Sequence, residues 1–547
     1  MSMKISFLGG VGEIGMNMYL YETENSAVIV DCGVQFADSE FPGVDYVIPD
    51  FLYLKKVKDK LKAIILSHGH EDHIGGVSYL LKLFNLPIYA GKLTLELLKY
   101  KLAEAKIKGN FLEVSDQSIK LIDDIVVSFF QVNHSIPDTF GIKIKSGKNA
   151  FLHMSDFKID KTPVSQKPFS RERFLKFLDN DDITAIVCDS TCCIYEGFSP
   201  SERSVKEDLY KIIKDARGRI FFTTFSSNID RIKQVIEICE ELNKKVVFEG
   251  RSILKNILIA HSLGYINYNQ QNIINLNKAR GYKDSELLFI ISGCQGEQNS
   301  TLYKIVSKER TSLQVKKGDL FIISSRVIPG NEKNVNRAIN FIYYNDAKVV
   351  DIEKENIHVS GHAYQGDIRE IVSLSKPKYF IPVHGEFMHL KVNIENINFD
   401  KNVEKSIFTE DGKQLLFDED SDLKEILDIP YGKVYVDTRG VGEFGEDILK
   451  VRKNIARDGV LVVIYNPDRI SDISKLQFYA VGFELSDNII YYLKKSINEN
   501  LSILLETANY DIFKFEDIFA RFIRKLVKKR MDRRPEIKII KMVGLND

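Results

Sequence analysis

The sequence is poor in cysteine and proline, and it has no long apolar run. Six cysteines in 547 residues form no CxxC pair, so we expect buried thiols rather than disulfides or a thiolate metal site. Thirteen prolines and 33 glycines leave no room for a long disordered tract. No stretch reaches the roughly 18 consecutive apolar residues of a membrane helix, and the first apolar run turns to glycine too early for a signal peptide. The sequence therefore predicts a folded cytoplasmic protein without a membrane partner.

Neither sign of charge is in excess. Lys and Arg together number 76, as do Asp and Glu, so no global positive field indicates a nucleic-acid partner, and any polyanion site must be local. One local candidate is the segment 521–534, RFIRKLVKKRMDRR, with eight basic side chains. This segment is either a nucleic-acid contact or a solvated helix face beside a dimer or domain contact.

The order of the predicted elements indicates an α/β protein with more than one domain. A chain of 547 residues exceeds what one hydrophobic core usually serves. Short β-rich runs mixed with helical patterns predict a mixed sheet in residues 1–205 and again in 346–425. Between them, residues 206–345 alternate between apolar strands and amphipathic helices, as a parallel α/β unit does. We therefore expect 206–345 to be inserted into the first domain, followed by a linker at 426–450 and a C-terminal domain at 451–547.

Three of the ten histidines lie within six positions, in LSHGHEDHIGG at residues 66–76. They follow the apolar run AIIL, so they lie where a strand ends and a helix begins. Three more candidates each follow another apolar run, and a shared sheet would bring these strand ends to one edge. Imidazole nitrogen and carboxylate oxygen together suit zinc or manganese. The sequence therefore predicts a divalent-metal centre of seven side chains: His68, His70, Asp72, His73, His134, Asp156 and His384.

Seven ligands are enough for two metal ions. Two ions about 3.5 to 4 Å apart activate a shared water and clamp an in-line displacement at phosphorus. The expected division is His68, His70 and His134 for one ion, Asp72, His73 and His384 for the other, with Asp156 bridging the two.

The HxHxDH pattern, followed by a strand-end His, a strand-end Asp and a final His, is similar to the metallo-β-lactamase motifs. Asp31 in VIVDCG matches the early aspartate of that superfamily, which supports the ligands rather than binding metal. The inserted unit resembles the β-CASP insertion of the nucleic-acid-processing branch. The resemblance implies an α/β fold in which a metallo-β-lactamase αββα sandwich carries an inserted β-CASP α/β domain and a small C-terminal α/β domain.

Finer motifs along essentially the whole chain resemble the ribonuclease J family. They include GGVGEIGMNMY, HGHEDHIGG, VNHSIPD, TFSSNIDR, GCQGEQ, IPGNEKNVNRAIN, HVSGHA and PKYFIPVHGE. The resemblance implies a metal-dependent ribonuclease with 5′-to-3′ exonuclease and endonuclease activity on single-stranded RNA, which leaves 5′-phosphate products in rRNA processing and mRNA decay. It also implies two zinc or manganese ions per chain, a preference for 5′-monophosphorylated RNA, and a homodimer or homotetramer formed through the C-terminal region.

The same resemblance assigns catalytic and substrate-binding residues. Asp189 in CDST and His362 in HVSGHAYQ would form an acid/base pair in which the carboxylate orients the imidazole, and Asp72 completes the catalytic set. One of the two serines in TFSSN has an alternative as the N-cap of the helix that follows. The predicted substrate-binding residues are Ser226, Ser227, His358, Ser360 and His362.

Five residues depart from the family pattern: Met16, Ser155, Cys192, Cys294 and Arg326. We expect none of them to touch a metal ligand. Met16 replaces a basic side chain near the entrance of the catalytic channel, and Arg326 is either a phosphate contact or part of a salt bridge.

Two other classes of function stay open. A metallo-β-lactamase-fold nuclease acting on DNA would use the same ligands, whereas a small thioester hydrolase has no use for a second α/β unit. A catalytically silent RNA-binding subunit has no need of all seven ligands, so their presence favours an enzyme.

Overall fold

The computed structural model describes residues 1–36, 41–310, 312–398, 403–437, 442–467, 472–509 and 511–542. The chain divides into two compact units, Met1–Phe36 with Ile48–Gly432 and Ala37–Val47 with Lys433–Asp547. Within the described ranges, no helix combines the length and the apolar character needed to cross a bilayer. The first unit contains every residue that the sequence predicts for the site.

The first unit contains two mixed β-sheets. The first sheet has the order β24-β23-β1-β3-β4-β7-β8-β9 and the second has the order β10-β11-β12-β13-β14-β20-β22. The strands of the first sheet are β1 (Met3–Gly9), β3 (Met18–Glu22), β4 (Ala27–Val30), β7 (Leu61–Ile65), β8 (Pro87–Ala90), β9 (Asn110–Glu113), β23 (Lys413–Phe417) and β24 (Leu423–Asp428). Those of the second are β10 (Ile119–Ile122), β11 (Ile125–Val132), β12 (Thr139–Ser146), β13 (Asn149–Met154), β14 (Ala185–Asp189), β20 (Tyr379–Val383) and β22 (Lys405–Ser406).

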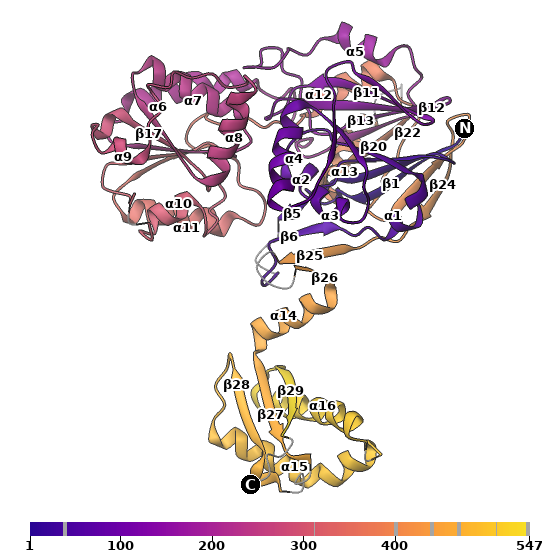
Figure 1. The fold of residues 1–547 in the computed structure, drawn as a ribbon, viewed down its shortest axis with the longest axis vertical. Helices are drawn as coiled ribbons and strands as arrows, with labels where there is room; N and C mark the ends of the chain where they lie inside the picture. Colours follow the sequence, from indigo (N-terminus) through magenta and orange to yellow (C-terminus); the bar gives the residue numbers. More distant parts are fainter. Residues whose placement is uncertain are drawn as a thin grey trace. The chain divides into compact units, whose positions relative to one another are not determined.

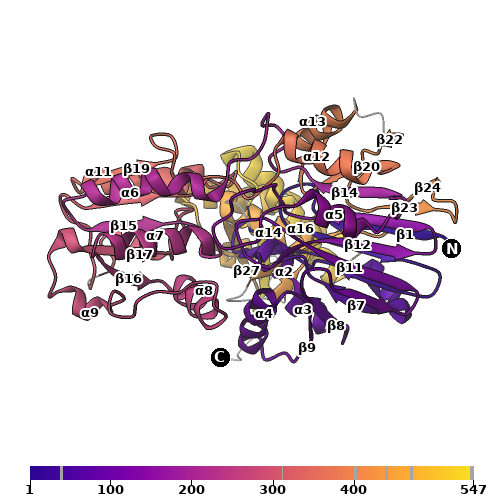
Figure 2. The ribbon, with the colours of Figure 1, turned by 90° about the horizontal axis from the view of Figure 1, so that it is seen from above.

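Apolar side chains that alternate between the two faces of a strand contribute to two different hydrophobic cores. In β11, Val127 and Phe129 belong to the core shared by the two sheets, whereas Phe130 and Val132 belong to the core under the helices of the second sheet, because successive side chains of a strand point to opposite faces. Figure 2 shows α12 and α13 on one side of the two sheets and α3 and α4 on the other. The predicted αββα sandwich is confirmed. The helices are α1 (Leu52–Lys56), α2 (Glu71–Ile74), α3 (Val77–Leu81), α4 (Lys92–Glu104), α5 (Arg171–Leu178), α12 (Gln365–Ser375) and α13 (Phe387–Ile397), and two short strands, β2 (Val11–Gly12) and β21 (Gly385–Glu386), pair in parallel.

A third sheet, entirely parallel, lies between β14 and β20 in sequence. Its order is β16-β17-β15-β18-β19, and every residue of β17 is buried, as expected for a parallel strand covered on both faces. Figure 1 shows α6 and α7 on one side of this sheet and α10 and α11 on the other. The elements are α6 (Lys206–Asp215), β15 (Ile220–Thr223), α7 (Ile229–Glu241), β16 (Lys245–Glu249), α8 (Arg251–Ser262), α9 (Leu276–Ala279), β17 (Leu287–Ile291), α10 (Thr301–Val306), β18 (Leu320–Ile323), α11 (Glu332–Tyr344) and β19 (Lys348–Asp351).

The second unit has its own core beneath a sheet of order β28-β27-β29. Along α16, Phe519, Ile523 and Val527 are buried, whereas Lys525 and Lys528 are exposed, so the basic segment is the solvent side of an amphipathic helix. The elements are β25 (Lys433–Asp437), β26 (Gly442–Phe444), α14 (Glu446–Asp458), β27 (Val460–Tyr465), β28 (Gln477–Val481), α15 (Asp487–Thr507), α16 (Ile512–Met531) and β29 (Glu536–Lys541). Two further short strands are β5 (Gln35–Phe36), which belongs to the first unit, and β6 (Tyr46–Pro49), which includes residues of both units.

Candidate metal centre

The predicted ligands lie at strand ends of both sheets of the sandwich. His68 follows β7 of the first sheet, whereas His134, Asp156 and His384 follow β11, β13 and β20 of the second. His70 precedes α2, which carries Asp72 and His73. The two packed sheets therefore bring all seven side chains to one edge, although Asp72 and His384 are 312 residues apart in sequence.

Three histidines form the first cluster. The Nδ1 atom of His70 lies 3.0 Å from Nε2 of His68 and 3.1 Å from Nε2 of His134. The Oδ2 atom of Asp156 lies 3.4 Å from Nε2 of His68 and 3.3 Å from Nε2 of His134. Four potential ligand atoms, one from each side chain, are thus close enough to surround a single cation.

A second cluster adjoins the first. The Oδ2 atom of Asp72 lies 3.2 Å from Nε2 of His384 and 3.5 Å from Nε2 of His73. The other carboxylate oxygen of Asp156, Oδ1, lies 3.2 Å from Nε2 of His73 and 3.2 Å from Nδ1 of His384. One oxygen of Asp156 therefore faces each cluster.

The carboxylate of Asp156 is the strongest sign that the site accommodates metal. Both of its oxygens are buried and accept no hydrogen bond, and such a buried charge is costly unless it is paired or coordinates a metal. Five ring nitrogens lie within 3.8 Å of those oxygens, from His68, His73, His134, His362 and His384. This donor set fits divalent ions that take nitrogen and carboxylate ligands.

Metal ligands must be neutral imidazoles and ionised carboxylates, and the histidines of the two clusters differ in this respect. Burial lowers the pKa of His73 and His384, but the neighbouring carboxylates, Asp156 first, outweigh it and raise both pKa values well above the usual range, so these two rings would lose a proton when metal binds. Burial lowers the pKa of His70 to about 3, and it also holds the pKa of His134 well below its usual range. Burial opposes ionisation of Asp156, but the neighbouring His73 and His384 outweigh it and hold the pKa of that carboxyl well below its usual range.

Asp31, to which the superfamily resemblance gives a supporting role, contacts His73 of the second cluster. Its Oδ2 atom is 2.7 Å from Nδ1 of His73 and accepts from the Ser67 hydroxyl at 2.7 Å. Its Oδ1 atom accepts from the backbone N–H of Ser67 at 2.8 Å. The hydroxyl of Ser155 joins this network 3.4 Å from Nδ1 of His73. We expected none of the five residues that depart from the family pattern to touch a predicted ligand, and this is wrong for Ser155. Ser67 also supports the ligands, although no sequence motif indicated it.

The predicted acid/base pair is in contact. Nδ1 of His362 lies 2.8 Å from Oδ2 of Asp189, and Nε2 of His362 lies 3.8 Å from Oδ2 of Asp156. Burial lowers the pKa of His362, but Asp189 and Asp156 outweigh it and raise that pKa. Thr191 was not predicted; its hydroxyl donates to Oδ1 of Asp189 at 2.7 Å and lies 3.0 Å from Nδ1 of His384, which ties the pair to the second cluster.

The four residues predicted to bind a 5′-phosphate fall into two places. Ser360 accepts a hydrogen bond from the backbone N–H of His362 at 3.2 Å, and Nδ1 of His358 is buried without a partner. The serine pair precedes α7, and Ser226 Oγ accepts from Asn256 at 3.2 Å. Among the described residues, no hydrogen bond links Ser226 or Ser227 to His358 or Ser360. The alternative that a serine caps α7 is wrong, because the side chain of Asn228 caps that helix.

The structure also shows the surroundings of three other residues that depart from the family pattern, namely Met16, Cys192 and Arg326. Met16 is fully buried with a φ of 55°, so the methionine that replaces a basic side chain packs inside the fold. All six cysteines are free and buried. Arg326 and Cys192 contact each other, with Nη1 3.8 Å from Sγ. Within the described part of the chain, no carboxylate lies within ion-pair distance of Arg326, so the salt-bridge alternative is wrong there.

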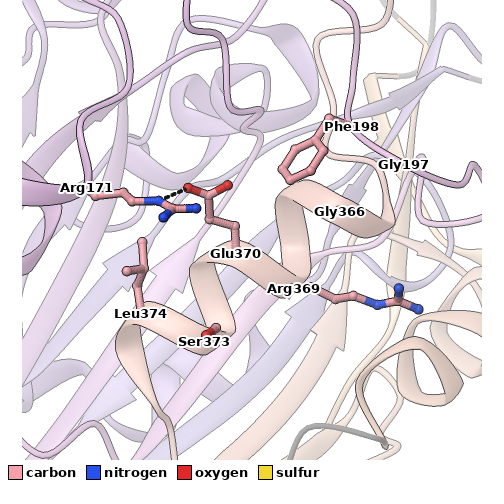
Figure 3. Close-up of a pocket in the computed structure, with 8 residues that line it drawn as sticks. All are labelled: Arg171, Gly197, Phe198, Gly366, Arg369, Glu370, Ser373 and Leu374. Carbon is pink, nitrogen blue, oxygen red and sulfur yellow. Dashed lines mark hydrogen bonds and ion pairs between the residues drawn. The ribbon is translucent and has the colours of Figure 1, made fainter.

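A separate pocket of about 460 Å³ lies along α12 (Figure 3). None of the predicted site residues lines it. The Nε atom of Arg171 donates to Glu370 at 2.7 Å in this pocket. The lining residues are Arg171, Gly197, Phe198, Gly366, Arg369, Glu370, Ser373 and Leu374.

Comparison with protein families matches four parts of the chain. Residues 11–136 match the metallo-beta-lactamase superfamily, and residues 217–342 match the ribonuclease J beta-CASP domain. Residues 349–404 match the Zn-dependent metallo-hydrolase RNA specificity domain, and residues 447–543 match the ribonuclease J C-terminal domain.

Curated relatives match over nearly the whole chain. Ribonuclease J of Helicobacter pylori is 36% identical, over 98% of this chain and 79% of the relative. Ribonuclease J2 of Bacillus subtilis is 30% identical over 98% of both chains, and ribonuclease J of Thermus thermophilus is 33% identical over 97% of this chain and 93% of the relative. A crystal structure of a protein of unknown function from Enterococcus faecalis, 15% identical, superposes with a TM-score of 0.55 over 76% of this chain and 100% of that one, which shows the fold alone. The chain therefore belongs to the ribonuclease J family, and it is a divalent-metal hydrolase with the metallo-β-lactamase fold and an inserted β-CASP domain.

Proposed function

We propose that this enzyme hydrolyses the phosphodiester bonds of single-stranded RNA, both from the 5′ end and internally, and leaves 5′-phosphate products. The observation that carries the proposal is the carboxylate of Asp156, whose two buried oxygens face ring nitrogens of two adjoining clusters and accept no hydrogen bond. The relatives named ribonuclease J support RNA as the substrate. The cellular roles that follow are rRNA processing and mRNA decay in the cytoplasm.

Two divalent ions, zinc or manganese, would share the centre. When bound, they supply Lewis acids that polarise the scissile phosphate and lower the pKa of water. The side chain of Asp72 is 27% exposed, against 1% for Asp156, so Asp72 is the ligand carboxylate that faces arriving water and substrate. The residues that would hold the ions are His68, His70 and His134 for one, Asp72, His73 and His384 for the other, and Asp156 for both.

His362 would act as the proton donor to the leaving 3′ oxygen. Its Nδ1 atom is held by Asp189 at 2.8 Å, so the opposite nitrogen, Nε2, is turned toward the centre. A carboxylate that fixes one ring nitrogen sets the tautomer and the orientation of an imidazole, which general acid catalysis requires. Thr191 holds the same carboxylate at 2.7 Å and would limit its rotation.

The 5′-phosphate would bind near His362, at His358 and Ser360, with Ser226 and Ser227 lining the path of the RNA. Hydroxyl and imidazole groups are suitable donors to phosphate oxygens. Base stacking and backbone contacts, which are tolerant of sequence, would hold a single strand in the channel. We further propose that the C-terminal region mediates assembly into a homodimer or homotetramer.

Digestion of RNA tests the proposal directly. One RNA, labelled at its 5′ end and carrying a monophosphate, triphosphate or hydroxyl there, is incubated with zinc or manganese. We expect labelled mononucleotide from the monophosphate RNA. Excess chelator should abolish this release, because the centre then lacks its Lewis acids. The His70→Ala variant, which removes a central ligand atom of the first cluster, should release none.

The same digestion separates the rival functions. A matched DNA that is degraded as fast as the RNA would identify a nuclease without sugar preference and contradict the assignment of RNA. Intact RNA in every lane, combined with tight binding, would indicate a silent RNA-binding subunit. Internal fragments that do not depend on the 5′ group would leave only the endonuclease.

Asp31→Asn should weaken metal binding without removing a ligand. The charged carboxylate lies 2.7 Å from Nδ1 of His73 and makes the opposite ring nitrogen a better donor. We expect metal affinity to fall roughly 10- to 100-fold, measured by competition with a chelating dye. Activity should recover at high metal concentration. Glu104→Gln, on the exposed side of α4, is the control and should bind metal as the parent does; unchanged affinity in Asp31→Asn would contradict a supporting role.

A further inference from the structure

Arg326 lies in the loop between β18 and α11, beside the predicted phosphate pocket. Its guanidinium carbon is 4.9 Å from the centre of the Tyr195 ring, and Nη1 is 3.8 Å from Sγ of Cys192. That sulfur is 3.2 Å from the hydroxyl of Ser360, which in turn accepts from the backbone of His362. A short chain of contacts therefore runs from Arg326 to the acid/base pair.

The loop holds the guanidinium in this place. The side-chain amide of Gln295 donates to the backbone carbonyl of Arg326 at 2.9 Å and accepts from the backbone N–H of Ile328 at 2.8 Å. The Tyr195 ring itself packs against Tyr364 with ring centres 5.1 Å apart. A guanidinium that lies over an aromatic ring can still donate from N–H groups at its edge, so Arg326 can donate to a ligand from groups other than the Nη1 that contacts Cys192.

Among the residues that the structure describes, Arg326 has no counter-ion. Of the cations near His358, Arg231 is paired with Glu202 at 2.8 Å, and Lys158 lies 3.9 Å from Asp160. No carboxylate of the described residues lies within ion-pair distance of Arg326, which is partly buried. Partly buried charge without a partner is unfavourable, and an anionic ligand would compensate it.

Positively charged side chains also surround His358. Burial together with Arg231, Arg326 and Lys158 holds the pKa of His358 well below its usual range. Its Nδ1 atom is buried and has no hydrogen-bond partner. A neutral imidazole with a free ring nitrogen, a hydroxyl and a guanidinium thus occur together, and this set can bind a phosphate monoester.

We propose that Arg326 binds the terminal phosphate of 5′-monophosphorylated RNA together with His358 and Ser360, and so strengthens the preference for that end. The inference rests on the proposed function for its substrate. A phosphate monoester carries up to two negative charges, and a planar guanidinium can donate two parallel hydrogen bonds to it. A 5′-hydroxyl offers no such partner and leaves the charge of Arg326 uncompensated.

Binding without turnover tests the assignment. A short oligoribonucleotide labelled with fluorescein at its 3′ end, with either a 5′-phosphate or a 5′-hydroxyl, is titrated in chelator by fluorescence anisotropy. Arg326→Gln should weaken binding of the phosphate RNA roughly 10- to 100-fold and change the hydroxyl RNA by less than about twofold. Arg326→Lys keeps the charge but loses the fork, and should fall between. Arg337→Gln removes an exposed arginine of α11 and should preserve the ratio of the two affinities.

Each contrary outcome has a distinct meaning. Equal weakening of both RNAs by Arg326→Gln would assign Arg326 to an internal phosphate and overturn the proposal, as would an unchanged ratio or a parent protein that binds both ends equally. The proposed function is judged separately by cleavage. A protein that prefers the 5′-phosphate through Arg326 yet cuts no RNA would retain this inference and lose the ribonuclease.

Discussion

Asp156→Asn should abolish RNA cleavage and release most of the bound metal while the fold is retained. Its two buried oxygens face the two clusters, so one substitution removes a shared ligand and the negative charge that opposes two cations. Loss of a residue that merely supports a ligand costs roughly 10- to 100-fold in affinity or activity; loss of the shared ligand should exceed about 100-fold. Metal content per chain and the rate of mononucleotide release are the measurements.

The control for this variant is Asp116→Asn. Asp116 pairs with Lys167 at 3.4 Å and lies outside both clusters, so its loss should leave metal content unchanged. The circular dichroism spectrum of Asp156→Asn should match that of the parent. A variant that retains both ions and most of its activity would refute the assignment of Asp156 as the shared ligand.

Arg231→Met should destabilise the β-CASP domain more than any surface substitution. The side chain of Arg231 is fully buried, and its guanidinium pairs with Glu202 at 2.8 Å and donates to the carbonyl of Ile357 at 2.7 Å. Removing one partner of a buried ion pair leaves an uncompensated charge and costs about 3–5 kcal/mol. Hydrogen exchange of peptides covering α7 and residues 357–360 measures the local free energy of unfolding, which avoids assuming one transition for a multidomain chain.

A second variant and a surface pair provide the comparison. Replacing both Arg231 and Glu202 with methionine removes the unpaired charge and should recover part of the stability, because hydrophobic replacement of a whole buried pair is often tolerated. Lys211→Met breaks an exposed ion pair with Glu207, 2.9 Å long, and should produce no measurable change. Arg231→Met that is as stable as the parent would show that the buried pair contributes nothing.

Much of the site could be predicted because strand ends are readable in the sequence. The apolar runs before His68, His134, Asp156 and His384 indicate buried strands. The expectation that one sheet carries these strand ends holds for the last three, because strand ends of one sheet can meet at its edge, but it is wrong for His68, whose strand β7 belongs to the other sheet of the sandwich. The spacing of HxHxDH also placed its members on one turn and one short helix. The choice of nitrogen and oxygen donors then followed from the residue types alone.

Contacts between distant loops could not be predicted in this way. Asp189 and His362 are 173 residues apart, and the order of residues does not state which loops meet. Ser67, Ser155 and Thr191 are ordinary hydroxyl residues whose importance comes only from their neighbours. The burial of Met16 could not be predicted for the same reason, because the exposure of a residue beside glycines in a loop depends on the packing around it.

The sequence by itself determined the kind of centre: nitrogen and carboxylate ligands at strand ends, an inserted parallel α/β unit, and resemblance to one family. Only the tertiary structure decided how the side chains meet, including the placing of Asp156 between two clusters, the contact of His362 with Asp189, and the unpaired charge of Arg326 beside Ser360 and His358. The physical reason is that hydrophobic periodicity specifies local elements, whereas the orientation of a polar side chain depends on hydrogen-bond partners supplied by segments hundreds of residues away.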